Sequence, residues 1–172
     1  MVNLPKRIDD KGPLVPSGIE GRVRIADGTD VDAADLRFVA QKLWPLCVPI
    51  DSVKMHPRNP NEGDVDGIAE SVETFTQYAP IVIQESTSYI AKGNHTYQAV
   101  ARVGSKYIAA VPMDWDDATT LAVLVGDNRH SEKAKREARG LADILKELDE
   151  QEMLLGTGYS SDDVQTLLDA LD

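Results

Sequence analysis

Gly93, Asn94, His95 and Thr96 are the residues of this sequence whose types and spacing best suit the binding of an anion. They follow a short apolar run at 89–91 and open a segment with helical periodicity, so a strand is predicted to turn into a helix here. The first N–H groups of a helix lack partners within it and lie at the positive end of its dipole, which suits phosphate. A plain capped helix with nothing bound has the same local pattern, and that alternative stays open.

The composition narrows the class of protein. The 172 residues are 42% hydrophobic, enough for one domain with a core plus appendages. A formal net charge of −11 argues against a strong DNA-binding surface over the whole molecule, because such surfaces neutralise phosphates with Lys and Arg. No apolar run is long enough to span a membrane and no signal-peptide pattern is present, so we expect a cytosolic protein.

Cys47 is the single cysteine, and its neighbours Leu46 and Val48 are apolar. A lone thiol in such surroundings is predicted to be a small buried side chain rather than a nucleophile or a metal ligand. One cysteine excludes an intramolecular disulfide, and no Cys/His cluster suggests zinc.

The segments before the turn are predicted as follows. Residues 1–30 contain several prolines and glycines without periodicity and are predicted to be a flexible arm, and residues 31–45 to add a helix that Pro45 ends. Arg58 lies in an extended loop at 56–61, as either a solvated charge or a phosphate contact. The other elements are a strand at 47–50, a helix from Asp64 or Asp66 to Phe75, and strands at 80–84 and 88–92.

The segments after the turn are mostly helical. A buried strand is predicted at 107–113, followed by a helix that Asp116 or Asp117 caps and that reaches 126–129. A long charged helix is predicted from about 132 to 148, with Ala138, Leu141, Ala142, Leu145 and Leu148 inward. A glycine-rich break at 156–159 then precedes a short helix capped by Ser161.

Four motifs in this order resemble the ParB/sulfiredoxin superfamily. They are 48–53 with the HPRNPN loop, 68–72 followed by Gln77 and 80–82, the turn at 93–96, and 127–129 after a helix rich in Ala and Leu. Over about residues 46–172 the chain is similar to the ParB-like N-terminal domain, often named ParB-like nuclease, of phage, plasmid and methyltransferase-associated proteins. The resemblance implies an α+β fold, a small mixed sheet flanked by helices, in a domain at 46–130 with a helical C-terminal extension at 131–172.

The resemblance also implies a nucleotide site. By position in the family's GERR turn, Gly93, Asn94, His95 and Thr96 would face the phosphates of CTP or ATP. Asn128 and Arg129 would contact phosphate, with Arg58 as a further candidate, and Asp127 would bind Mg²⁺ or lie beside its ligands. In this sequence His95 and Thr96 stand in place of the two arginines of GERR, and Asn94 replaces the cysteine of sulfiredoxin.

Three functions follow from these observations. The first is a nucleotide-binding protein of phage or plasmid DNA metabolism, acting as a switch or a weak nucleotide hydrolase, in the host cytoplasm if a phage encodes it. The second is a metal-dependent nuclease or DNA-binding protein, which ranks lower because Asp127 is the only carboxylate placed near the turn and the net charge repels DNA. The third is a non-catalytic interaction module, in which the added helices form a homodimer or a partner surface.

Overall fold

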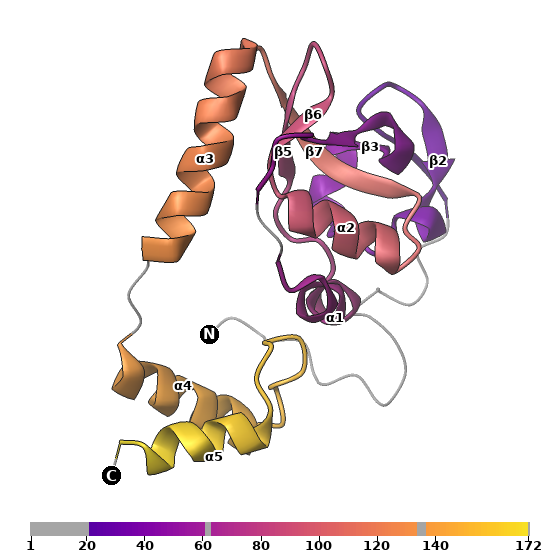
Figure 1. Cartoon of the computed structure of the whole chain (residues 1–172). Helices are drawn as coiled ribbons and strands as arrows, with labels where there is room; N and C mark the ends of the chain where they lie inside the picture. Colours follow the sequence, from indigo (N-terminus) through magenta and orange to yellow (C-terminus); the bar gives the residue numbers. More distant parts are fainter. Residues whose placement is uncertain (1–20, 61–62, 134–136, 172) are drawn as a thin grey trace.

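A five-stranded mixed sheet forms the centre of the computed structural model, which describes residues 21–60, 63–133 and 137–171 (Figure 1). The strand order is β3 (Cys47–Pro49), β7 (Tyr107–Met113), β5 (Ile81–Gln84), β6 (Tyr89–Lys92) and β4 (Lys54–Met55). The edge strand β3 pairs antiparallel with β7, the edge strand β4 pairs parallel with β6, and the central strands β5 and β7 are parallel. The predicted α+β fold with a mixed sheet is confirmed.

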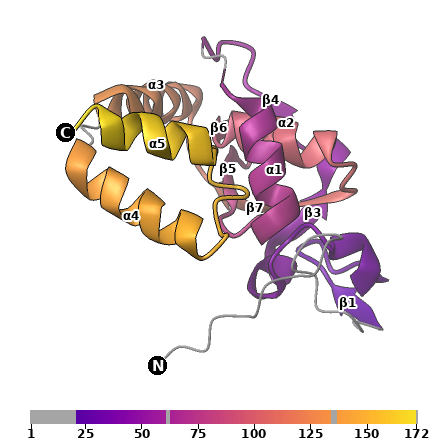
Figure 2. The same ribbon diagram turned by 90° about the horizontal axis from the view of Figure 1, so that it is seen from below.

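Helices α1 (Val65–Phe75) and α2 (Asn94–Arg102) contact each other and cover one face of the sheet (Figure 2). Asp64 caps α1, as one of the two predicted alternatives, by accepting the N–H of Gly67. Because side chains alternate along a strand, Ile108 and Ala110 of β7 join the core beneath these helices while Ala109 points to the other face.

The opposite face of the sheet is covered by the N-terminal part of the described chain. Strands β1 (Arg22–Arg24) and β2 (Asp30–Asp32) form an antiparallel hairpin. Its apolar side chains pack against Cys47 and Ala109 in a second core cluster. The flexible arm predicted at 1–30 is therefore wrong for residues 21–30, whereas residues 1–20 lie outside the described residues.

The single helix predicted within 31–45 is also wrong. Two 3-10 helices replace it, η1 (Ala33–Leu36) and η2 (Gln41–Leu46), and a third, η3 (Ile50–Ser52), follows β3. Between η1 and η2, Val39 forms an isolated parallel β-bridge with Gln77, whose N–H donates to Phe38 O (2.7 Å) and whose carbonyl accepts from Ala40 N (3.1 Å). This long-range pairing outweighs the local helical pattern.

Helix α3 (Asp117–Lys133) lies beside β6 at one side of the sheet (Figure 1). Asp116 caps it, since its carboxylate accepts the N–H of Thr119 at 2.7 Å. Among the apolar residues of α3, Leu124 is buried and Leu121 is half-buried, whereas Ala118, Ala122 and Val125 are exposed.

The helix predicted from 132 to 148 is divided in the structure. Helix α3 continues to Lys133, and α4 (Ala138–Glu150) begins anew where the side chain of Glu137 accepts the N–H groups of Arg139 and Gly140. Ala138 is consequently exposed, whereas Ala142 and Leu145 are buried.

Helix α5 (Ser161–Asp169) lies beside α4 and forms a C-terminal hairpin with it (Figure 2). Its cap is Ser160, not Ser161, because Ser160 and Asp163 form a reciprocal capping box. The loop between the two helices lies against α1: a Cβ on Gly156 would come within 2.7 Å of the Phe75 ring. In the described part of the chain, no helix is both long and apolar enough to cross a membrane.

Candidate functional site

The turn between β6 and α2 is built around Gly93. This residue has φ +94°, and a Cβ on it would lie 2.7 Å from Cγ2 of the buried Ile81. Glycine is therefore required here for its backbone conformation and for the close approach of the sheet. The helix begins at Asn94, and its N-cap residue Gly93 supplies no capping side chain.

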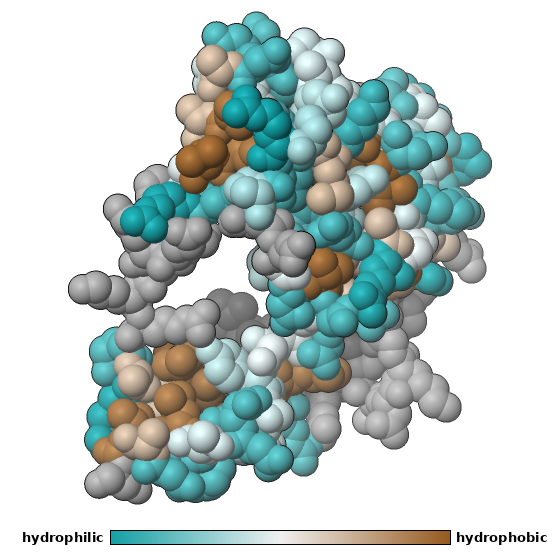
Figure 3. Space-filling view, in the orientation of Figure 1, coloured by the Kyte–Doolittle hydropathy of each residue, from teal (hydrophilic) through white to brown (hydrophobic). Residues whose placement is uncertain are grey.

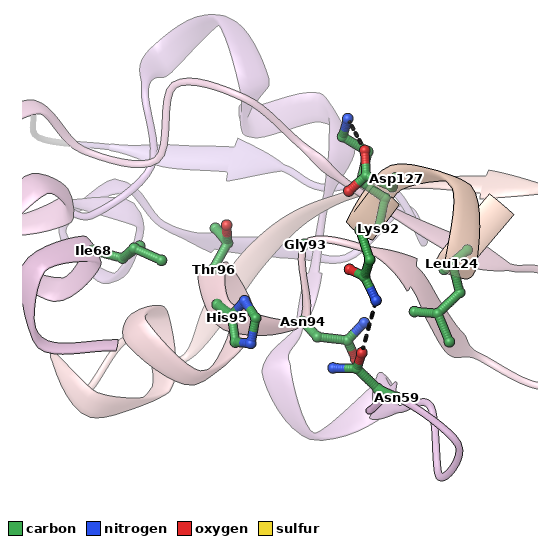
Figure 4. A pocket seen from close by; sticks show the side chains of 11 residues that line it. Asn59, Ile68, Lys92, Gly93, Asn94, His95, Thr96, Leu124 and Asp127 are labelled. Carbon is green, nitrogen blue, oxygen red and sulfur yellow. Dashed lines mark hydrogen bonds and ion pairs between the residues drawn. The ribbon is translucent and has the colours of Figure 1, made fainter. Parts of the chain in front are cut away.

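A pocket of about 260 Å³ opens at this end of α2 (Figure 4). It brings together six residues that were predicted to form a site: Gly93, Asn94, His95, Thr96, Asp127 and Asn128. The remaining lining residues come from the loop after β4, from α1, β6 and α3, and are Asn59, Ile68, Ala91, Lys92 and Leu124. Arg58 and Arg129 have exposed side chains and do not line the pocket.

Two residues of the turn also contact the protein around it. Asn94 is buried, and its side chain accepts the N–H of His56 and donates to Ile90 O, each at 3.3 Å. His95 is half-buried, and its ring lies so close to Gly63 that a Cβ there would be 2.6 Å away. The side-chain amide of Asn94 is therefore occupied by hydrogen bonds within the protein and joins the turn to the loop at His56.

Two polar contacts join α3 to the core at the pocket (Figure 4). The Lys92 ammonium is 2.6 Å from Asp127 Oδ1, and Asn128 Nδ2 is 3.4 Å from Asn59 Oδ1. Lys92 and Asn59 were not predicted as site residues. The sequence could have indicated Lys92, because it is a cation directly before the glycine of the turn that was predicted to bind an anion.

The acidic residues that the structure describes do not form a metal site made of protein ligands alone, but the pocket fits Mg²⁺ that a nucleotide brings. Across residues 21–60, 63–133 and 137–171, no three His, Cys, Asp or Glu side chains are grouped to hold an ion. Among the lining residues, Asp127 contributes the one carboxylate. Mg²⁺ needs few protein ligands when phosphates and water supply the rest, so this pocket fits Mg²⁺ carried by a nucleotide.

Comparison with known proteins reveals similarity at the level of structure. No family model matches the sequence, and no curated protein does. The structure is similar to C-terminally truncated ParB of Caulobacter crescentus complexed with CTP-γ-S, with a TM-score of 0.51, 21% identity, and 70% of this chain and 69% of that chain covered. The complex of that protein with the centromeric parS site gives a TM-score of 0.41, 19% identity, and coverage of 70% and 63%. This chain therefore has a ParB-like fold.

Proposed function

We propose that the pocket binds a nucleoside triphosphate, CTP or ATP, through its phosphates. One observation carries the proposal: the N-terminus of α2, whose N-cap residue Gly93 has no side chain, opens into a polar pocket at the end of β6. The similarity in fold to a ParB protein complexed with CTP-γ-S supports the same assignment.

The residues of the turn would bind the phosphates by hydrogen bonding. The backbone N–H groups of Asn94, His95 and Thr96 donate to phosphate oxygens, aided by the helix dipole, and the hydroxyl of Thr96 and the ring of His95 add donors. The volume of about 260 Å³ lies just below the range of about 300–1,000 Å³ that encloses a drug-sized ligand. The phosphates would therefore occupy the pocket, with the sugar and base at its mouth, and the exposed Arg58 and Arg129 remain candidates for further phosphate contacts.

Asp127 and Asn128 are placed to support a nucleotide-bound ion. Asp127 would hold Mg²⁺ together with phosphate oxygens, and Asn128 would hydrogen bond to a phosphate beside it. Mg²⁺ supplies positive charge that this turn, without arginines, lacks.

The nucleotide would act as a switch, with hydrolysis weak or absent, because Asp127 is the one carboxylate among the lining residues that the structure describes and a second would be needed to orient a water. The order of the motifs supports a role in phage or plasmid DNA metabolism. A second role as an interaction module, including a homodimer, is favoured by one observation: the C-terminal hairpin exposes large apolar side chains (Figure 3), with Ile144 59% and Leu155 62% exposed.

Isothermal titration with CTP, ATP and GTP, each with and without Mg²⁺, tests the nucleotide proposal. We expect saturable, Mg²⁺-dependent binding of CTP or ATP, weakened in His95→Ala with little loss of stability because the ring is only half-buried. Binding that His95→Ala leaves unchanged would remove this residue from the site. No binding at millimolar nucleotide would contradict the proposal and leave the interaction module.

A further inference from the structure

Lys92 occupies the position in the pocket where a phosphate group needs a cation. It ends β6, immediately before Gly93, and among the described residues that line the pocket it is the one Lys or Arg. Alternation along β6 buries Ala91 and leaves Lys92 exposed toward the pocket. The ammonium and the first N–H groups of α2 therefore present positive charge to the same space.

Asp127 neutralises that charge in the structure. Its Oδ1 lies 2.6 Å from Lys92 Nζ, and both side chains line the pocket. The carboxylate therefore occupies, relative to the ammonium, the place that an anionic oxygen of a ligand would take. The side chains are 57% and 33% exposed for Lys92 and Asp127, and an ion pair in contact with water contributes little to stability, so exchange of its anion costs little.

We propose that Lys92 is the phosphate-binding cation of this pocket and that Asp127 is its counter-ion in the ligand-free protein. Binding of a polyphosphate exchanges the partner of Lys92 from the carboxylate of Asp127 to a phosphate oxygen. The proposal rests on the proposed nucleotide function. It identifies Lys92 as the source of the positive charge that the turn at 93–96 does not itself carry. It further implies that Asp127, which repels phosphate while it remains at Lys92, opposes the binding of anions without a metal.

The test uses inorganic tripolyphosphate in EDTA at low ionic strength, titrated into the full chain. Lys92→Met is expected to weaken binding about tenfold because a charged hydrogen bond is lost, and Lys92→Gln is expected to do the same. Asp127→Asn is expected to strengthen it about fivefold because the competing negative charge is removed.

A matched ion pair elsewhere supplies the control. Lys106 Nζ lies 2.8 Å from Asp35 Oδ1, with side chains 68% and 34% exposed, and neither residue lines the pocket. Lys106→Met and Asp35→Asn change the net charge by the same amounts as Lys92→Met and Asp127→Asn, and they are expected to leave tripolyphosphate binding unchanged. Equal effects of the substitutions at the two ion pairs would show that only the net charge of the protein affects binding, and would overturn the proposal.

The remaining outcomes separate the two proposals. Wild-type binding of Mg²⁺-nucleotide that Lys92→Met and Lys92→Gln leave unchanged would overturn the role of Lys92 and retain the nucleotide site. Weaker tripolyphosphate binding by Asp127→Asn in EDTA would overturn its role as a counter-ion. If neither the wild type nor Asp127→Asn binds nucleotide or tripolyphosphate, both proposals are wrong.

Discussion

The side chain of Asn94 accepts a hydrogen bond from the backbone N–H of His56, at 3.3 Å, and so joins the α2 turn to the loop after β4. The other end of the same amide donates to Ile90 O, also at 3.3 Å. Asn94 is buried, and the loop that begins at His56 carries Asn59 to the pocket. One side chain therefore holds two walls of the pocket in place.

We expect Asn94→Ala to lower the free energy of unfolding by about 1–3 kcal/mol, because buried groups lose their hydrogen-bond partners. It should also weaken nucleotide binding, since the loop is no longer fixed to the turn. Urea unfolding measures the first effect. Asn128→Ala is the control for stability, because the hydrogen bond of Asn128 to Asn59 Oδ1 is 3.4 Å long and the residue is only half-buried. Equal unfolding midpoints for the two variants would contradict the structural role of Asn94.

Gly93→Ala and Gly104→Ala form a matched pair, because both glycines have positive φ, +94° and +74°. Around Gly104 no atom lies within 4 Å of an added Cβ, so alanine there pays only the backbone strain of about 1–2 kcal/mol. Alanine at Gly93 must also displace the buried Ile81, for about 1–3 kcal/mol more. Thermal unfolding should rank Gly93→Ala as the less stable, and equal melting temperatures would show that the close packing at the turn is unimportant.

The elements next to the turn were predictable because their signals are local. Asp64 before an apolar periodicity marks the start of α1, and a short apolar run followed by Gly93 marks the end of β6. The grouping of Asp127 and Asn128 with the turn followed from the resemblance of the motifs, not from periodicity, and the structure places them in the same pocket.

The errors arose where distant residues decide the local structure. The backbone pairing of Gln77 with Phe38 and Ala40 breaks a helical pattern that is valid by itself. The division of the helix predicted from about 132 to 148 has a local cause instead, because the side chain of Glu137 caps a new helix within that segment. The role of Lys92 depends on α3 bringing Asp127 beside it, 35 residues later in the chain, which no local pattern indicates.

Gly156 and Gly158 test the contact between the C-terminal hairpin and α1. Both have positive φ, +80° and +78°, but only a Cβ on Gly156 would meet α1, at 2.7 Å from the Phe75 ring. Gly156→Ala should therefore increase amide hydrogen exchange in the loop between α4 and α5 and at the end of α1. Gly158→Ala should strain the loop without increasing amide hydrogen exchange at the end of α1. Equal exchange rates in the two variants would argue against a contact between this loop and α1.

Cys47 is buried, and burial raises the pKa of its thiol from 9.0 to about 12. The native thiol is therefore protonated at pH 8 and should not react with Ellman's reagent until urea unfolds the protein. Since the unfolded thiol ionises first, its contribution to stability is complete below about pH 9 and is lost as the pH rises toward 12. Stability should fall less steeply above pH 9 in Cys47→Ala, and rapid labelling of the native protein would contradict the burial.

The location of nucleotide binding is tested most directly by amide chemical shifts of ¹⁵N-labelled protein titrated with Mg²⁺-CTP and Mg²⁺-ATP. We expect the largest shifts at Asn94, His95 and Thr96, followed by Asp127 and Asn128. A groove between α1 and α2, lined by Asp66, Ala69, Glu70, Glu73, Arg102 and Val103, provides an internal reference that should not shift. Shifts confined to that groove, or none at millimolar nucleotide, would contradict a phosphate site at the α2 turn.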